Sequence, residues 1–140
     1  MKVMVSACLM GRDCKYNGGN NFSSVLAEYL KDKEVVEICP EVLAGFPTPR
    51  PRIERVNGRV FNELGEDVHD QCLLGVQKAV KIALQEKVDL AILQSRSPSC
   101  GVNEIYDGTF SGVRIPGHGL FAEELMRAGI SVLDIEDLQR

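Results

Sequence analysis

Short apolar runs separated by helical patterns constrain the fold of this chain more than any other feature. The runs lie at residues 3–7, 35–38, 90–93 and 131–133, and between them apolar residues recur at helical spacing, most clearly over residues 70–86. Such alternation is typical of βαβ units, in which the strands run parallel within one sheet. The sequence therefore predicts an α/β fold, a Rossmann-like three-layer sandwich with a mainly parallel sheet of about four strands.

The segments between these runs predict two small hairpin excursions and one stiff loop. The dipeptide Asn57-Gly58 favours a tight hairpin turn, and we expect a second hairpin-like excursion around Asp107-Gly108. Residues 40–57 contain four of the six prolines, which fix φ and remove backbone donors, so we expect a stiff loop there. The chain shows no internal repeat, and we expect a single domain over residues 1–140.

Composition argues against several classes of protein. The net charge is -4 and the pI is near 5.2, whereas nonspecific binders of nucleic acid or of anionic membranes need a basic surface. Val5-Ser6-Ala7-Cys8 faintly resembles a lipoprotein cleavage box, but the apolar stretch before it is too short for a secretory signal. No run reaches the roughly 18 apolar residues of a membrane helix. We therefore expect a cytoplasmic protein with no nucleic-acid or membrane partner.

Five cysteines in a reducing compartment point to metal binding, catalysis or burial rather than to structural disulfides. Three of them, Cys8, Cys39 and Cys100, each follow a predicted strand and precede residues suited to a tight backbone turn. Parallel strands end at the same edge of a sheet, where ligands bind, so one residue after each strand can reach a common site. The placement predicts a single site, and its thiols indicate a metal.

The other two cysteines are weaker candidates. Cys72 shares a helix face with Val76 and Ala79, so we interpret it as part of the core. Cys14 lies in the polar loop after Cys8 as either a fourth ligand or a bystander, and we favour the bystander. Three thiolates leave one coordination position open for water or substrate, which suits catalysis better than a structural role. Zinc and a [4Fe-4S] cluster with one unligated iron both fit this pattern.

Three separated motifs resemble those of one bacterial family. They are Ser6-Ala7-Cys8-Leu9-Met10-Gly11 with Tyr16-Asn17-Gly18, Cys39-Pro40-Glu41 with Gly45-Phe46-Pro47-Thr48-Pro49-Arg50, and Ser97-Pro98-Ser99-Cys100-Gly101 with Tyr106-Asp107-Gly108-Thr109-Phe110. Their combination, over residues 3–129, resembles the family catalogued as domain of unknown function 523, which includes thiouracil desulfidases. The resemblance implies a [4Fe-4S] cluster held by Cys8, Cys39 and Cys100, and removal of sulfur from a thiolated pyrimidine.

The resemblance also implies roles for two residues beside the cysteines. Glu41 matches the family's acid/base glutamate, and Ser97 matches a serine that assists substrate or proton positioning. In this scheme the substrate sulfur binds the unligated iron and water attacks the adjacent carbon, without net redox change. From the residues alone, Glu41 is equally well explained as a cap of the local turn, and Ser97 is better explained as a turn-former before Pro98.

Four further residues are candidates for substrate binding: Tyr16, Asn17, Arg50 and His118. Arg50, like its neighbour Arg52, can donate two hydrogen bonds to pyrimidine oxygens or a phosphate, although a surface salt bridge is the more frequent role of an Arg. His118 lies between two glycines at a predicted helix start, where an anion pocket and a simple cap are alternatives. Tyr16 and Asn17 either line the pocket or fix the long first loop.

These observations leave three hypotheses. The leading one is a desulfidase with an air-sensitive iron-sulfur cluster, which acts on a small-molecule thiolated nucleobase or a related thioamide. The second is a noncatalytic metal-binding or cluster-binding module that senses or passes on a cluster. The third is a cluster-free Rossmann-like domain that binds a nucleotide, with its cysteines acting only as thiols. No motif fixes the oligomeric state or the physiological substrate.

Overall fold

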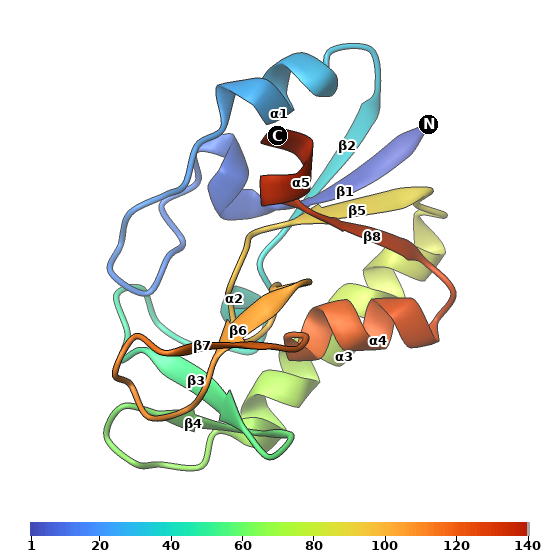
Figure 1. Ribbon diagram of the computed structural model, residues 1–140. Coiled ribbons are helices and arrows are strands. Elements are labelled where there is room, and N and C mark those ends of the chain that lie inside the picture. The colour runs from blue at the N-terminus through green and yellow to red at the C-terminus, as the bar shows by residue number, and fades with distance from the viewer. Residues whose placement is uncertain (140) are drawn as a thin grey trace.

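A parallel sheet of four strands, in the order β2-β1-β5-β8, forms the centre of the computed structural model, which describes residues 1–139 (Figure 1). The strands are β1 (Lys2–Ser6), β2 (Glu34–Ile38), β5 (Leu90–Leu93) and β8 (Ser131–Asp134). Val3 of β1 lies opposite Val35 and Leu90, and β5 pairs in turn with β8. The predicted sheet is confirmed, and the ends of each strand lie within one residue of their expected positions.

Helices cover both faces of this sheet. α1 (Ser24–Tyr29) and α5 (Ile135–Gln139) lie on one face, and α3 (His69–Gln85) and α4 (Leu120–Arg127) lie on the other (Figure 1). Alternate residues of β1 enter different cores, because successive side chains of a strand point to opposite faces. The two central strands, β1 and β5, are buried along most of their length and are mainly apolar, as expected for strands covered on both faces. The three layers form the predicted sandwich.

The long helix α3 approaches the sheet through a face of small residues. Its buried residues are Cys72, Gly75, Val76, Ala79 and Ala83. Cys72 is fully buried, and burial raises the pKa of its thiol to about 12. The interpretation of Cys72 as a core residue is confirmed. Neither α3 nor any other helix within residues 1–139 has the length and apolar character that a membrane crossing requires.

Both predicted hairpins are present. β3 (Ile53–Val56) pairs with β4 (Arg59–Asn62) around Asn57-Gly58, where both turn residues have positive φ, as this type of turn requires. β6 (Glu104–Tyr106) pairs with β7 (Arg114–Pro116). The two hairpins lie side by side at the loop-bearing end of the molecule, with β3 against β6 (Figure 1).

The proline-rich segment begins as a helix rather than as the expected stiff loop. This helix, α2 (Pro40–Leu43), directly follows Cys39. Proline suits its first position, because the fixed φ is helical and the missing N–H would have no partner there. α2 packs so closely on α3 that a Cβ on Gly75 would lie 2.1 Å from the Pro40 carbonyl oxygen. This contact fixes the chain just after β2.

Replacing Gly75 by alanine tests that contact. The added methyl group would collide with Pro40 and Ala44, and overpacking of this kind costs up to about 3 kcal/mol. Alanine gains only about 0.5–1 kcal/mol over glycine in a helix, so Gly75→Ala is expected to lower the free energy of unfolding. Urea denaturation measures the change, with the exposed Gln77→Ala on the same helix as the control. An undiminished stability in Gly75→Ala would show that α2 is free to move.

Candidate functional site

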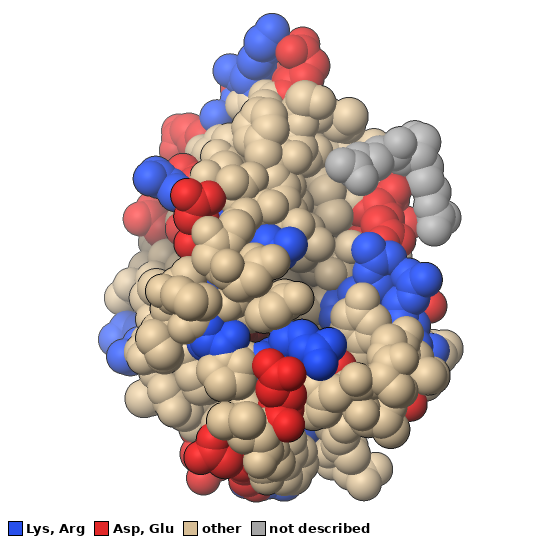
Figure 2. Space-filling view, turned by 90° about the vertical axis from the view of Figure 1, so that its left-hand side faces the viewer, with Lys and Arg blue, Asp and Glu red and all other residues tan. Residues whose placement is uncertain are grey.

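A cavity of about 440 Å³ lies at the carboxyl edge of the sheet, within the size range of small-ligand sites. Cys8 from the segment after β1, Cys39 from the segment after β2 and Cys100 from the loop after β5 all line it. β2 and β5 lie on opposite sides of β1, which is the arrangement that opens a ligand crevice in α/β sheets. Figure 2 views the loop-bearing side, where Lys and Arg side chains gather near the middle of the face.

Local structure positions each of the three thiols. Cys8 lies in the 3-10 helix η1 (Ala7–Met10) directly after β1, and Asn21 Nδ2 donates to its Sγ at 3.6 Å. Cys39 is the residue before α2, so its position depends on the packing of that helix. The backbone N–H of Cys100 donates to Ser97 Oγ at 3.1 Å. The sequence did not identify Asn21, because this residue lies thirteen positions after Cys8 in an irregular loop.

Cys14 lies beside the predicted ligands rather than out in solvent, and the expectation that it is not a ligand stays a prediction. It lines the same cavity, and its thiol is hydrogen-bonded with those of Cys8 and Cys39. The hydrogen bond with Cys14 lowers the pKa of Cys8, whereas the hydrogen bond with Cys14 and burial raise the pKa of Cys39. Burial also raises the pKa of Cys100.

The chemistry of the donors at this cavity fits an iron-sulfur cluster. Within residues 1–139, no group of three or more His, Cys, Asp or Glu side chains is placed to hold a metal ion. A zinc ion draws its sulfur ligands to about 2.3 Å from one centre. An iron-sulfur cluster instead takes one cysteine thiolate on each of several irons, and the three thiols that line this cavity from three separate segments can supply them. The donor atoms and the cavity together fit a cluster.

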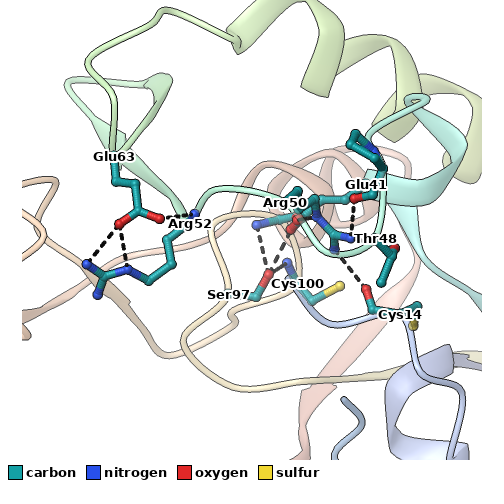
Figure 3. A network of polar contacts seen from close by, with 10 residues as sticks. Cys14, Glu41, Thr48, Arg50, Arg52, Glu63, Ser97 and Cys100 are labelled. Atoms are coloured by element: carbon teal, nitrogen blue, oxygen red, sulfur yellow. Dashed lines mark hydrogen bonds and ion pairs between the residues drawn. The ribbon is translucent and has the colours of Figure 1, made fainter. Parts of the chain in front are cut away.

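Glu41 lies on the wall of the same cavity with both carboxylate oxygens engaged (Figure 3). Arg50 Nε donates to Oε1 at 3.0 Å, and Ser99 Oγ donates to Oε2 at 2.7 Å. The side chains of Arg50 and Glu41 are only 4% and 12% exposed, so this is a buried ion pair and not a surface salt bridge. Ser99 was missed from the sequence, although its position next to Cys100 is a signal that places it near the site.

Arg50 connects several segments of the chain through its other donors. Nη2 donates to the Cys14 carbonyl oxygen at 2.8 Å, and Nη1 donates to Thr48 Oγ1 at 3.0 Å and to the Pro47 carbonyl oxygen at 3.3 Å (Figure 3). Its own backbone N–H donates to the Tyr16 carbonyl oxygen at 2.7 Å. Arg50 therefore fixes the loop after Cys8 and the proline-rich segment against Glu41.

The remaining predicted residues divide between the cavity and its surroundings. Ser97 lines the cavity, and its Oγ accepts from the backbone N–H groups of Ser99 and Cys100, which shapes the loop. Tyr16 also lines the cavity. Asn17 and His118 do not belong to the lining: Asn17 Oδ1 accepts from Gly19 N, and His118 Nδ1 contacts the Val102 carbonyl oxygen. Asn17 thus helps to fix the first loop.

Comparison with known proteins gives consistent results. The family model of 2-thiouracil desulfurase matches residues 3–137. The uncharacterized protein YbbK of Bacillus subtilis (strain 168) is 36% identical, with 97% of each chain covered. Among solved structures, the [4Fe-4S]-dependent thiouracil desulfidase TudS superposes with a TM-score of 0.92 at 37% sequence identity, over 99% of this chain and 93% of that one.

The two neighbouring arginines provide a matched test of the buried network. Removing one partner of a buried ion pair costs about 3–5 kcal/mol, because the other charge stays buried, so Arg50→Met is expected to destabilise the protein by about 3 kcal/mol. Arg52 pairs with Glu63 at the surface, and Arg52→Met is expected to cost less than about 1 kcal/mol. Urea denaturation of both variants measures this difference. Equal effects would contradict the structural role of Arg50.

Proposed function

This chain belongs to the 2-thiouracil desulfurase family, and on that premise we propose that it is a [4Fe-4S]-dependent desulfidase that hydrolytically removes sulfur from a thiolated pyrimidine or a related small thioamide. One observation carries the proposal: the thiols of Cys8, Cys39 and Cys100 line the same cavity as the Glu41 carboxylate. The similarity to TudS, a [4Fe-4S]-dependent thiouracil desulfidase, supports both the cofactor and the substrate class.

Three cysteines would hold the cluster, each through one thiolate on one iron. Cys8, Cys39 and Cys100 come from three different segments, so a bound cluster would join the segments after β1, β2 and β5. When bound, the cluster supplies an iron without a protein ligand, a Lewis acid that attracts a thiocarbonyl sulfur and makes the adjacent carbon more electrophilic. Cys14 remains a free thiol beside two of the ligands.

Glu41 provides the acid/base group for this hydrolysis. As water oxygen bonds to the thiocarbonyl carbon, the Glu41 carboxylate accepts a proton from that water and returns it to the departing sulfur. The second proton of that water is lost from the oxygen as the carbon-sulfur bond breaks and the carbonyl forms, so thiocarbonyl plus water gives carbonyl plus hydrogen sulfide, with no external electron carrier. A carboxylate has about four acceptor sites, and Glu41 uses one on each oxygen for Arg50 and Ser99. Each oxygen can therefore accept another hydrogen bond from water.

Arg50 and Ser99 keep the carboxylate in place during proton transfer. Charge-assisted hydrogen bonds on both oxygens restrict rotation of the Glu41 side chain, and accurate positioning of this kind is a large part of general-base catalysis. Ser97 acts on Glu41 through Ser99, because its Oγ accepts from the Ser99 N–H and lies 3.4 Å from the Ser99 hydroxyl. The serine matched by the resemblance therefore has a positioning role.

Single cysteine substitutions test which thiols hold the cluster. After anaerobic reconstitution, Cys8→Ser, Cys39→Ser and Cys100→Ser are expected to lose most of their iron and acid-labile sulfide, since serine is a poor ligand for these irons. Cys72→Ser is the control, because Cys72 lies in the core away from the cavity lining. Iron and sulfide assays per chain give the result. Full iron retention in Cys8→Ser would overturn the assignment.

Replacement of Glu41 by glutamine separates catalysis from cluster binding. The loaded Glu41→Gln variant is expected to keep its iron and sulfide but to release hydrogen sulfide from 2-thiouracil at least about 100-fold more slowly, because the amide cannot accept the proton. Iron content and thermal stability are measured on the same sample to exclude loss of structure. If the wild-type protein binds 2-thiouracil but never releases sulfide, a noncatalytic cluster-binding module is the better description.

A further inference from the structure

Most charged side chains around the cavity are already bound to other parts of the protein. Glu41 accepts hydrogen bonds from Arg50 and Ser99. The other carboxylate on the wall belongs to Glu54, and its Oε1 accepts from the backbone N–H groups of Gly108 and Phe110. At the rim, Arg52 pairs with Glu63 and Arg96 with Glu136. These groups shape the cavity, and each of them has a hydrogen-bond or ion-pair partner within the protein.

Two polar side chains on the wall differ from this pattern. Gln94 and Ser95 directly follow β5, and among residues 1–139 neither side chain has a hydrogen-bond partner. Both line the cysteine-bearing cavity and also border a neighbouring cavity of about 490 Å³. Ser95 is only 8% exposed, whereas Tyr16, which also lines the cavity, is 41% exposed. A polar group in such a position is satisfied by water or by a ligand.

The backbone beneath these side chains is fixed. The N–H of Gln94 donates to Ser6 Oγ at 2.9 Å, which ties the end of β5 to the end of β1. Ser6 itself is 2% exposed and also interacts with the Cys100 thiol. Gln94 and Ser95 therefore lie on a fixed part of the sheet edge, at the start of the loop that carries Cys100 and beside the end of β1, which precedes Cys8.

We propose that Gln94 and Ser95 are specificity-determining residues that recognise the ring N–H and the neighbouring carbonyl group of the substrate. A glutamine carboxamide offers a donor and an acceptor in one plane, and a ring with adjacent N–H and C=O groups offers the complementary pair. Ser95 adds a hydroxyl that both donates and accepts. The inference rests on the proposed function, and it assigns substrate recognition to residues that the sequence motifs did not include.

Such recognition selects substrates by their ring N–H and carbonyl groups as well as by their sulfur. A site that uses buried polar groups for a substrate N–H discriminates against an analogue without it, because those groups are then left unpaired. The loaded protein is therefore expected to bind 2-thiouracil at least about tenfold more tightly than its N3-methyl derivative. This difference in affinity between 2-thiouracil and its N3-methyl derivative is expected to depend on Gln94.

The test measures binding of both compounds to anaerobically loaded protein by calorimetric titration, and sulfide release in parallel. Gln94→Met, which keeps the approximate size of the side chain, is expected to weaken binding of 2-thiouracil about tenfold, to leave iron content unchanged and to bind the two compounds alike. Ser95→Ala is also expected to weaken binding of 2-thiouracil. Gln77→Met, at an exposed position on α3, is the control for a glutamine-to-methionine change.

The outcomes distinguish this inference from the proposed function. Wild-type affinity and undiminished discrimination in loaded Gln94→Met would overturn the inference while leaving desulfidation intact. Binding of 2-thiouracil that depends on Gln94 but yields no sulfide would support the inference and reject the catalytic proposal. If the loaded wild-type protein binds neither compound, the inference also falls.

Discussion

The buried ion pair between Arg50 and Glu41 is the interaction on which the site depends. Removal of two charges from water is costly unless the pair is well aligned and the other donors and acceptors are satisfied. Here the guanidinium also donates to the Cys14 carbonyl oxygen and to Thr48, while Ser99 donates to the second carboxylate oxygen. One network therefore connects the loop after β1, helix α2 and the loop after β5, which are the segments that bear the three proposed cluster ligands.

Close backbone contacts hold these segments against the rest of the fold. α2 meets α3 at Gly75, and the loop of Ser97 and Ser99 meets the start of α4 at Gly119, where a Cβ would lie 2.4 Å from the Ser99 carbonyl oxygen. At both positions only a residue without a side chain allows the approach. The packing of the helices thus determines where the irregular loops place their polar groups. The site is therefore already arranged before a ligand binds.

The parts of this structure that sequence reasoning predicted depend on local patterns. The strand ends follow from the periodicity of apolar residues, and the first hairpin follows from its Asn57-Gly58 turn. The common direction of parallel strands predicts the sheet-edge location of Cys8, Cys39 and Cys100. The position of Cys14 did not follow, because a polar loop carries no periodicity. Nor did the burial of Arg50, since it depends on partners up to 36 positions away in the chain. For Glu41 and Ser97, only the family resemblance distinguished a site residue from an ordinary turn residue.

The central claim is that three cysteines leave one iron of the cluster open to the substrate. Mössbauer spectroscopy of the loaded protein, before and after addition of 2-thiouracil, tests it most directly. The account predicts one iron site that is distinct from the other three and whose isomer shift alone changes when 2-thiouracil is added. Four irons with equivalent thiolate coordination, unchanged by 2-thiouracil, would contradict the account and would indicate that Cys14 closes the cluster as a fourth ligand.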